Sequence, residues 1–232
     1  SVLLLMLAPP HRALGWKLVL HIFLAGIFFY SWIRAVGGSR AAGLLGGVAY
    51  MLAPFLVGFI HPGHDGKIFV TALAPLMFWV TERHFRAPGW VSFSGVGLVV
   101  ASIIYTTHFQ MAYFLFGGVG MYAIFRSIQL GRGVDEVGFG SRPRAGALRL
   151  ILFLAASVTG AAGAAWQLLP AAQYVTEYSR RTQMTSAATG QVGRDWSSSF
   201  SMNPEEVASL IVPEFAGNLA GGGISRSARV CR

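Results

Sequence analysis

Six long apolar runs without Asp, Glu, Lys or Arg occupy most of this 232-residue sequence. They cover residues 18–33, 41–60, 68–81, 87–107, 109–125 and 150–172. A helix needs about 20 apolar residues to cross a bilayer, within a range of roughly 17 to 25. The run 68–81 is short, but the long side chain of Lys67 can reach the interface at its start. The pattern predicts an all-α, polytopic transmembrane bundle of about six crossings, with residues 2–10 as part of a further apolar element.

The composition supports a membrane protein and argues against a nucleic-acid partner. The chain is 54% hydrophobic and only 12% charged, whereas an ordinary soluble domain is about 25% charged. The net charge is +9, but the basic residues flank the apolar runs and do not form one basic patch. The single cysteine, Cys231, excludes an internal disulfide. Without an initiator Met or a recognisable leader, the sequence is expected to be a fragment of a longer protein.

The basic residues also predict an orientation. Nine of the 18 Lys and Arg residues lie between alternate runs: Arg34, Arg40, Arg83, Arg86, Arg126, Arg132, Arg142, Arg144 and Arg149. Because cytoplasmic loops are enriched in Lys and Arg, residues 34–40, 82–89 and 126–149 are predicted to be cytoplasmic. The segments 61–67, 106–110 and 173–232 are then external. We therefore expect two regions, a partial transmembrane bundle over 1–172 and an extracytoplasmic segment over 173–232.

The sequence HPGHDGK, residues 61–67, is a compact polar segment between two apolar runs. Pro62 and Gly63 predict a turn, and Asp65 is predicted to cap a helix that starts near Gly66. Lys67 would then lie in the first turn, where the helix dipole disfavours a cation unless an anion is bound. Two interpretations stay open: Lys67 and His64 grip a phosphate at the outer surface, or Lys67 only anchors the helix.

Metal binding is the alternative chemistry for the same segment. His61, His64 and Asp65 offer nitrogen and oxygen ligands, and His108 could complete a set from the neighbouring external turn. The spacing does not identify a metal site, because Pro62 prevents a regular helix from placing both histidines on one face. The cofactor is therefore left open: a divalent metal is possible but not expected.

Three further segments carry polar groups on the predicted outer side. His108 and Gln110 lie where two apolar runs meet, either as a polar hairpin that satisfies backbone groups or as part of a cavity with residues 61–67. Arg180 and Arg181 follow the last run, where either a bound phosphate or anionic lipid head groups would explain them. Residues 204–212 predict a short amphipathic helix.

Four stretches together resemble a known family. They are GHDGK, TTHFQMAY, LLPAAQYVTEYSRR and SMNPEEVASLIVPEFAG. They resemble the bacterial YfhO-like multi-pass membrane proteins, which are similar to the GT-C glycosyltransferase superfamily. The resemblance extends over most of residues 1–217.

The resemblance implies a transferase in the bacterial cytoplasmic membrane. It would move a sugar from a polyprenyl-phosphate carrier to a cell-envelope glycan acceptor on the outer face, with membrane lipids around the bundle. In that superfamily the base is a carboxylate of the first external loop, and this chain is expected to begin after that loop, so Asp65 is only a weak candidate for a catalytic residue. Residues that match the stretches above, His64, Lys67, His108, Gln110, Arg180 and Arg181, would bind the lipid phosphate or substrate.

Two other classes of function stay open. A transporter or flippase would bind an anionic lipid or solute without chemistry, and broken helices would favour it. A non-catalytic assembly subunit would use HPGHDGK only for folding. Fold analogy does not decide among them, because function resides in the site.

Overall fold

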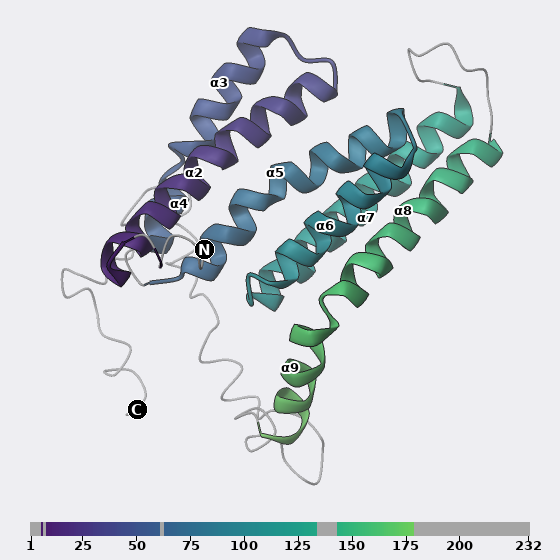
Figure 1. Ribbon diagram of the computed structural model, residues 1–232. Coiled ribbons are helices and arrows are strands. Elements are labelled where there is room, and N and C mark those ends of the chain that lie inside the picture. The colour runs from purple at the N-terminus through teal and green to yellow at the C-terminus, as the bar shows by residue number, and fades with distance from the viewer. Residues whose placement is uncertain (1–5, 7, 61–62, 134–142, 179–232) are drawn as a thin grey trace, which may run out of the picture. The chain divides into compact units, whose positions relative to one another are not determined.

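The computed structural model describes residues 6, 8–60, 63–133 and 143–178 (Figure 1). Within these residues the chain forms helices and no β-strand, which confirms the all-α fold class. The helices are α2 (Pro10–Ala35), α3 (Arg40–Met51), α4 (Pro54–Ile60), α5 (Asp65–Arg86), α6 (Trp90–Ile104), α7 (Phe109–Arg132), α8 (Pro143–Gly163) and α9 (Ala165–Glu177). The predicted helix at 204–212 lies outside the described residues.

The chain forms two compact units, Ser1–Pro170 and Ala171–Arg232. The described part of the second unit, 171–178, is the C-terminal part of α9. There the Thr176 hydroxyl donates a hydrogen bond to the Ala172 carbonyl, as expected for a threonine within a helix. All other contacts described below belong to the first unit.

Successive passes of the first unit alternate in direction. Trp32 near the end of α2 stacks on Phe78 of α5, with ring centroids 4.9 Å apart. Nearer the start of both helices, His21 lies against Phe69 at 4.4 Å, so α2 and α5 run parallel. Glu82 near the end of α5 meets Arg126 near the end of α7. The ends of α2, α5 and α7 therefore lie with the starts of α3, α6 and α8, and we call this the basic end. The opposite end, with the starts of α5 and α7 and the ends of α6 and α8, is called the His108 end.

Helix α5 is the central helix of this unit. It contacts α2, α4, α6, α7 and α8, and Figure 1 shows it between the α2–α3 hairpin and the group of α6, α7 and α8. Val70, Met77 and Phe85 of α5 belong to one apolar core with residues of α6, α7 and α8. Burial of such side chains stabilises each by about 1.5–3 kcal/mol in water. In a bilayer, close van der Waals packing between the helices provides much of this stabilisation.

Four helical segments are long and apolar enough to cross a membrane: His11–Ala35, Arg40–Ile60, Phe109–Arg132 and Arg144–Gly163. Helix α6 is apolar but has only 15 residues. Helix α5 has 22 residues but carries charged residues at both of its ends. Length and composition thus support four of the six predicted crossings and indicate a multi-pass membrane protein.

The outward faces of these helices are strongly apolar. Leu45 of α3, Phe114 of α7 and Val158 of α8 are 74%, 64% and 68% exposed, and many other large apolar side chains are exposed beside them. Water-soluble monomers rarely expose apolar patches of more than a few hundred Å². A lipid environment removes this cost, because acyl chains replace water around these side chains.

Several predicted boundaries of helices and loops differ from those in the structure. The run 41–60 is divided into α3 and α4, because Pro54 removes a backbone donor and restricts the residue before it. The run 150–172 is interrupted at Ala164, between α8 and α9. Helix α5 continues through Arg86 and α7 through Arg132, so the predicted loops 82–89 and 126–149 begin within helices.

Glycines allow close helix contacts at several places, and at two of them a glycine of one helix faces a glycine of the other. A Cβ on Gly47 of α3 would lie 2.6 Å from the Gly26 carbonyl oxygen of α2. A Cβ on Gly160 of α8 would overlap the Gly97 carbonyl of α6. The small-residue spacings of the sequence therefore pack this chain's own helices.

Candidate binding site at the His108 end

The start of α5 packs directly against the turn between α6 and α7. A Cβ placed on Gly66 would lie 3.3 Å from both the Thr106 carbonyl oxygen and the His108 Cβ. The turn is tight, because Thr107 has a φ of 65°, a left-handed conformation that is uncommon for a β-branched residue. Two segments 40 residues apart in sequence thus meet, and the predicted convergence of 64–67 with His108 is found in the structure.

The local roles of His64 and Asp65 differ from the prediction. Asp65 is the first residue of α5 and His64 is its N-cap, so the predicted cap was wrong by one residue. The His64 side chain makes no capping hydrogen bond and is exposed. The Asp65 Oδ1 accepts a hydrogen bond from the Gly66 N–H at 2.9 Å. A carboxylate in the first turn also suits the positive end of the helix dipole.

His108 is the N-cap of α7. Its Nδ1 accepts a hydrogen bond from the Met111 N–H at 3.3 Å, which assigns the neutral ring a proton on Nε2. Its Cδ2 edge faces Gly66, since a Cβ there would lie 3.7 Å from Cδ2. The half-buried ring is therefore fixed by α7 and retains one N–H donor beside the start of α5.

Two lysines at this end lie on aromatic rings. The Lys67 Nζ is 5.6 Å from the centroid of Phe59 in α4, and the Lys17 Nζ is 3.9 Å from the centroid of Phe69 in α5. Both side chains are half-buried. Within the described residues, the two salt bridges belong to Glu82 and neither lysine has one. Cation–π contact holds each ammonium in place without neutralising its charge.

Sequence reasoning missed Lys17, although its position directly before an apolar run marks a membrane-interface residue. Gln110 is exposed in the first turn of α7, on the same end as His108. His61, Arg180 and Arg181 lie outside the described residues. In the part of the chain that the structure describes, no group of three His, Cys, Asp or Glu side chains could hold a metal ion.

A second polar cluster, which the sequence analysis missed, is buried at the basic end. Glu82 is 1% exposed and accepts three contacts: its Oε1 lies 2.6 Å from the Arg86 Nε, and its Oε2 lies 2.9 Å from the Arg126 Nε and 2.7 Å from the Tyr122 hydroxyl. Arg126 is 8% exposed and donates to the Gln129 Oε1 at 2.6 Å. We call Glu82, Arg86, Tyr122 and Arg126 the Glu82 cluster.

The sequence held a signal for this cluster. Glu82 and Arg86 are four residues apart, as are Tyr122 and Arg126, so each pair lies on one face of its helix. Which faces meet depends on the rotation of α5 against α7. The carboxylate is satisfied by side chains of the chain itself, so the cluster joins two helices and offers no site for a ligand.

His84 links α5 to α8 next to this cluster. Its Nε2 lies 3.0 Å from the Arg149 carbonyl oxygen and so donates to it, while Arg149 donates in turn to the Phe85 carbonyl. Burial lowers the pKa of His84 below its ordinary value, and the hydrogen bond to the Arg149 carbonyl opposes this only in part. His84 lies outside the four candidate spans and packs α5 against α8.

The two ends therefore differ in chemistry. The basic end has its buried carboxylate paired, whereas the His108 end presents two lysine ammonium groups, the His108 Nε2–H and the start of α5. Such a set of donors suits an anion with several oxygen atoms. No family model, no curated protein and no solved structure matches the chain.

Proposed function

We propose that the protein is an integral membrane glycosyltransferase that takes a sugar from a polyprenyl-phosphate carrier and transfers it to a cell-envelope acceptor at the outer face of a bacterial cytoplasmic membrane. The observation that carries the proposal is the contact of Gly66 with His108, which places Lys67 and the start of α5 beside a fixed histidine donor. The resemblance of GHDGK and TTHFQMAY to a GT-C-like family gives the reaction class.

The proposal includes all six predicted crossings. Helix α5 contacts five other helices. Its buried charge, Glu82, meets protein, whereas its exposed charges, Asp65, Arg83 and Arg86, lie in its first and last turns, where they can reach the membrane surface. Helix α6 has 15 residues, a length of about 22 Å at 1.5 Å per residue, and it would need local thinning of the bilayer. With six crossings, the His108 end would face outward and the basic end would face the cytoplasm.

The sugar transfer needs two things from the protein: a base that accepts the proton of the acceptor hydroxyl, and groups that stabilise the negative charge of the leaving phosphate. The acceptor hydroxyl oxygen forms a bond to the anomeric carbon, the bond from that carbon to the phosphate oxygen breaks, and the hydroxyl proton passes to a base. The negative charge that develops on the leaving lipid phosphate is stabilised by Lys67 and Lys17, with His64 if it is protonated. His108 and Gln110 orient sugar or phosphate oxygens, and Asp65 is the described carboxylate of the first unit nearest to these groups.

The test is thermal unfolding of the purified chain with polyprenyl phosphate. A ligand present at about 100 times its Kd stabilises a folded protein by about 2.7 kcal/mol, which corresponds to a shift of several degrees for a chain of this size. We expect that shift in the wild type and in the control variant Arg40→Ala, which removes an exposed cation at the basic end. Lys67→Ala should lose it, and Lys67→Arg should retain part of it.

Two further arms separate the alternatives. Unphosphorylated polyprenol should not stabilise the protein, because the proposed contacts are made to the phosphate. Release of sugar from a polyprenyl-phosphate sugar by the full-length protein would support the transferase, whereas binding by the full-length protein without release would favour a flippase. Equal stabilisation of the wild type and Lys67→Ala would contradict a phosphate site at the start of α5.

A further inference from the structure

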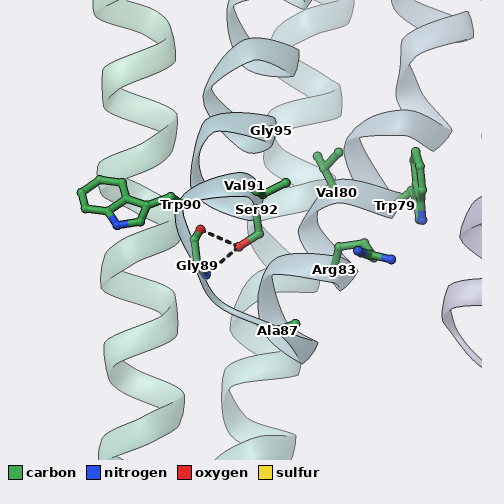
Figure 2. A pocket seen from close by; sticks show the side chains of 9 residues that line it. All are labelled: Trp79, Val80, Arg83, Ala87, Gly89, Trp90, Val91, Ser92 and Gly95. Carbon is green, nitrogen blue, oxygen red and sulfur yellow. Dashed lines mark hydrogen bonds between the residues drawn. The ribbon is translucent and has the colours of Figure 1, made fainter.

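A groove of about 860 Å³ opens at the basic end, where α5 ends and α6 begins. Its lining is mostly apolar and includes Trp79, Val80, Trp90, Val91 and Gly95, with one cation, Arg83. Figure 2 shows Trp79 and Arg83 on one side of the groove and Trp90 on the other. The volume lies within the range of about 300–1,000 Å³ that is usual for small-molecule sites.

The groove stays open because of how α6 begins. The Gly89 N–H donates to the Ser92 hydroxyl at 3.0 Å, and the same hydroxyl donates back to the Gly89 carbonyl at 3.0 Å (Figure 2). These bonds fix the first turn of α6. Gly95, one turn later, has no side chain, and a Cβ there would contact only Val80 at 3.9 Å. The absence of a side chain at Gly95 leaves apolar space beside Val80 in the groove.

The apolar wall faces outward and not toward another helix. Trp90 is 86% exposed and Val91 is 87% exposed. Tryptophan is enriched where a membrane meets water, because its ring suits the level of the head groups. The groove thus lies where lipid head groups and the first carbons of their chains meet the protein.

Arg83 gives the groove a positive charge that the described residues do not neutralise. The salt bridges that the described residues form both belong to Glu82, which binds Arg86 and Arg126. Arg83 is exposed and lines the groove. A guanidinium binds a phosphate through two parallel hydrogen bonds, and it is less strongly hydrated than an ammonium group.

We propose that this groove binds one anionic phospholipid, with its phosphate on Arg83 and an acyl chain along Val80, Val91 and Gly95. The chain has a net charge of +9, which favours an anionic over a zwitterionic lipid, since each basic residue near an anionic surface contributes about 1 kcal/mol. The site lies at the opposite end of the unit from His108, so it is independent of the proposed transferase function.

The test compares the full chain in nanodiscs of phosphatidylcholine with and without phosphatidylglycerol, by thermal unfolding. Arg83→Gln removes the charge in the groove, and Arg40→Gln removes an exposed charge at the same end but outside the groove. Phosphatidylglycerol should stabilise the wild type and Arg40→Gln alike. Its apparent affinity for Arg83→Gln should be weaker by about fivefold.

A second variant tests the acyl-chain part of the site. Gly95→Leu fills the space beside Val80, and we expect it to unfold at the wild-type temperature in pure phosphatidylcholine but to lose the response to phosphatidylglycerol. Equal losses in Arg83→Gln and Arg40→Gln would overturn the proposal in favour of diffuse surface attraction. Equal stabilisation by soluble glycerol phosphate would overturn it in favour of a free-anion site.

Discussion

Glu82 links α5 to α7 at the basic end through its carboxylate. It is 1% exposed and bridges α5 to α7 through Arg126 and Tyr122. Transfer of a charge from water into a low-dielectric interior costs several kcal/mol, which only well-placed partners offset. Removal of one partner therefore has a larger effect than the pair's net contribution to stability, because the remaining charge stays buried.

Glu82→Ala is expected to lower the free energy of unfolding by about 3–5 kcal/mol, because it leaves the buried Arg126 guanidinium without its carboxylate. Arg86→Ala should cost less, about 1 kcal/mol, because the Arg86 side chain is 41% exposed and Glu82 keeps Arg126 and Tyr122 as partners. Unfolding in detergent micelles measures both. Similar losses in the two variants would show that the cluster is not buried as described.

His84 predicts a dependence of stability on pH. Because burial lowers its pKa below the ordinary value of 6.5, the unfolded chain binds a proton at a higher pH than the folded chain. Its contribution to stability is complete above pH about 6.5 and falls as the pH decreases toward the lowered value. Thermal unfolding between pH about 7.5 and about 5.5 should therefore show a smaller loss in His84→Gln than in the wild type. An equal loss would assign the pH dependence to other groups.

At the level of helices, the contact between α6 and α8 depends on the absence of side chains. Gly97 and Gly160 bring the two backbones together, and this contact fixes α8 against the core next to Val96 and Val100 of α6. Without a hydrophobic driving force between helices in lipid, close van der Waals packing of this kind is what stabilises a helix pair.

Gly160→Ala is expected to destabilise the protein by about 1–3 kcal/mol, because the new methyl group would overlap the Gly97 carbonyl and separate the helices. Gly117→Ala in α7 is the matched control, because a Cβ there has no atom within 4 Å. There the exchange should stabilise by about 0.4–1 kcal/mol, through the lower entropy of the unfolded chain. Destabilisation by both variants would indicate a general effect of the substitution and not the α6–α8 contact.

At the scale of the whole molecule, the features that could be predicted from the sequence are those that the local pattern of apolar residues determines. Apolar runs predicted the helices, and their alternation brought residues 64–67 and His108 to one end, as the structure has them. The break at Leu52–Ala53 has a local cause in Pro54, whereas the burial of α5 was missed because it depends on packing between helices. The Glu82 cluster was missed for the same reason, since the rotation of α5 against α7 leaves no mark in a single sequence.

We propose that the helices cross the membrane in alternating directions, so that the His108 end faces outward and the basic end faces inward. Helix α6 tests this claim most sharply, because it has only 15 residues. Cys231 is the single cysteine of the chain, so Cys231→Ser gives a background without reactive thiols. Into this background we would introduce Thr107→Cys, in the turn after α6, or Pro88→Cys, in the turn before it.

The measurement is labelling by a membrane-impermeant maleimide, first on intact cells and then on permeabilised cells. We expect Thr107→Cys to be labelled on intact cells, whereas Pro88→Cys should be labelled only after permeabilisation. If both positions are labelled from the same side, α6 does not cross the membrane. If Thr107→Cys is labelled only after permeabilisation, the proposed external site at His108 is wrong.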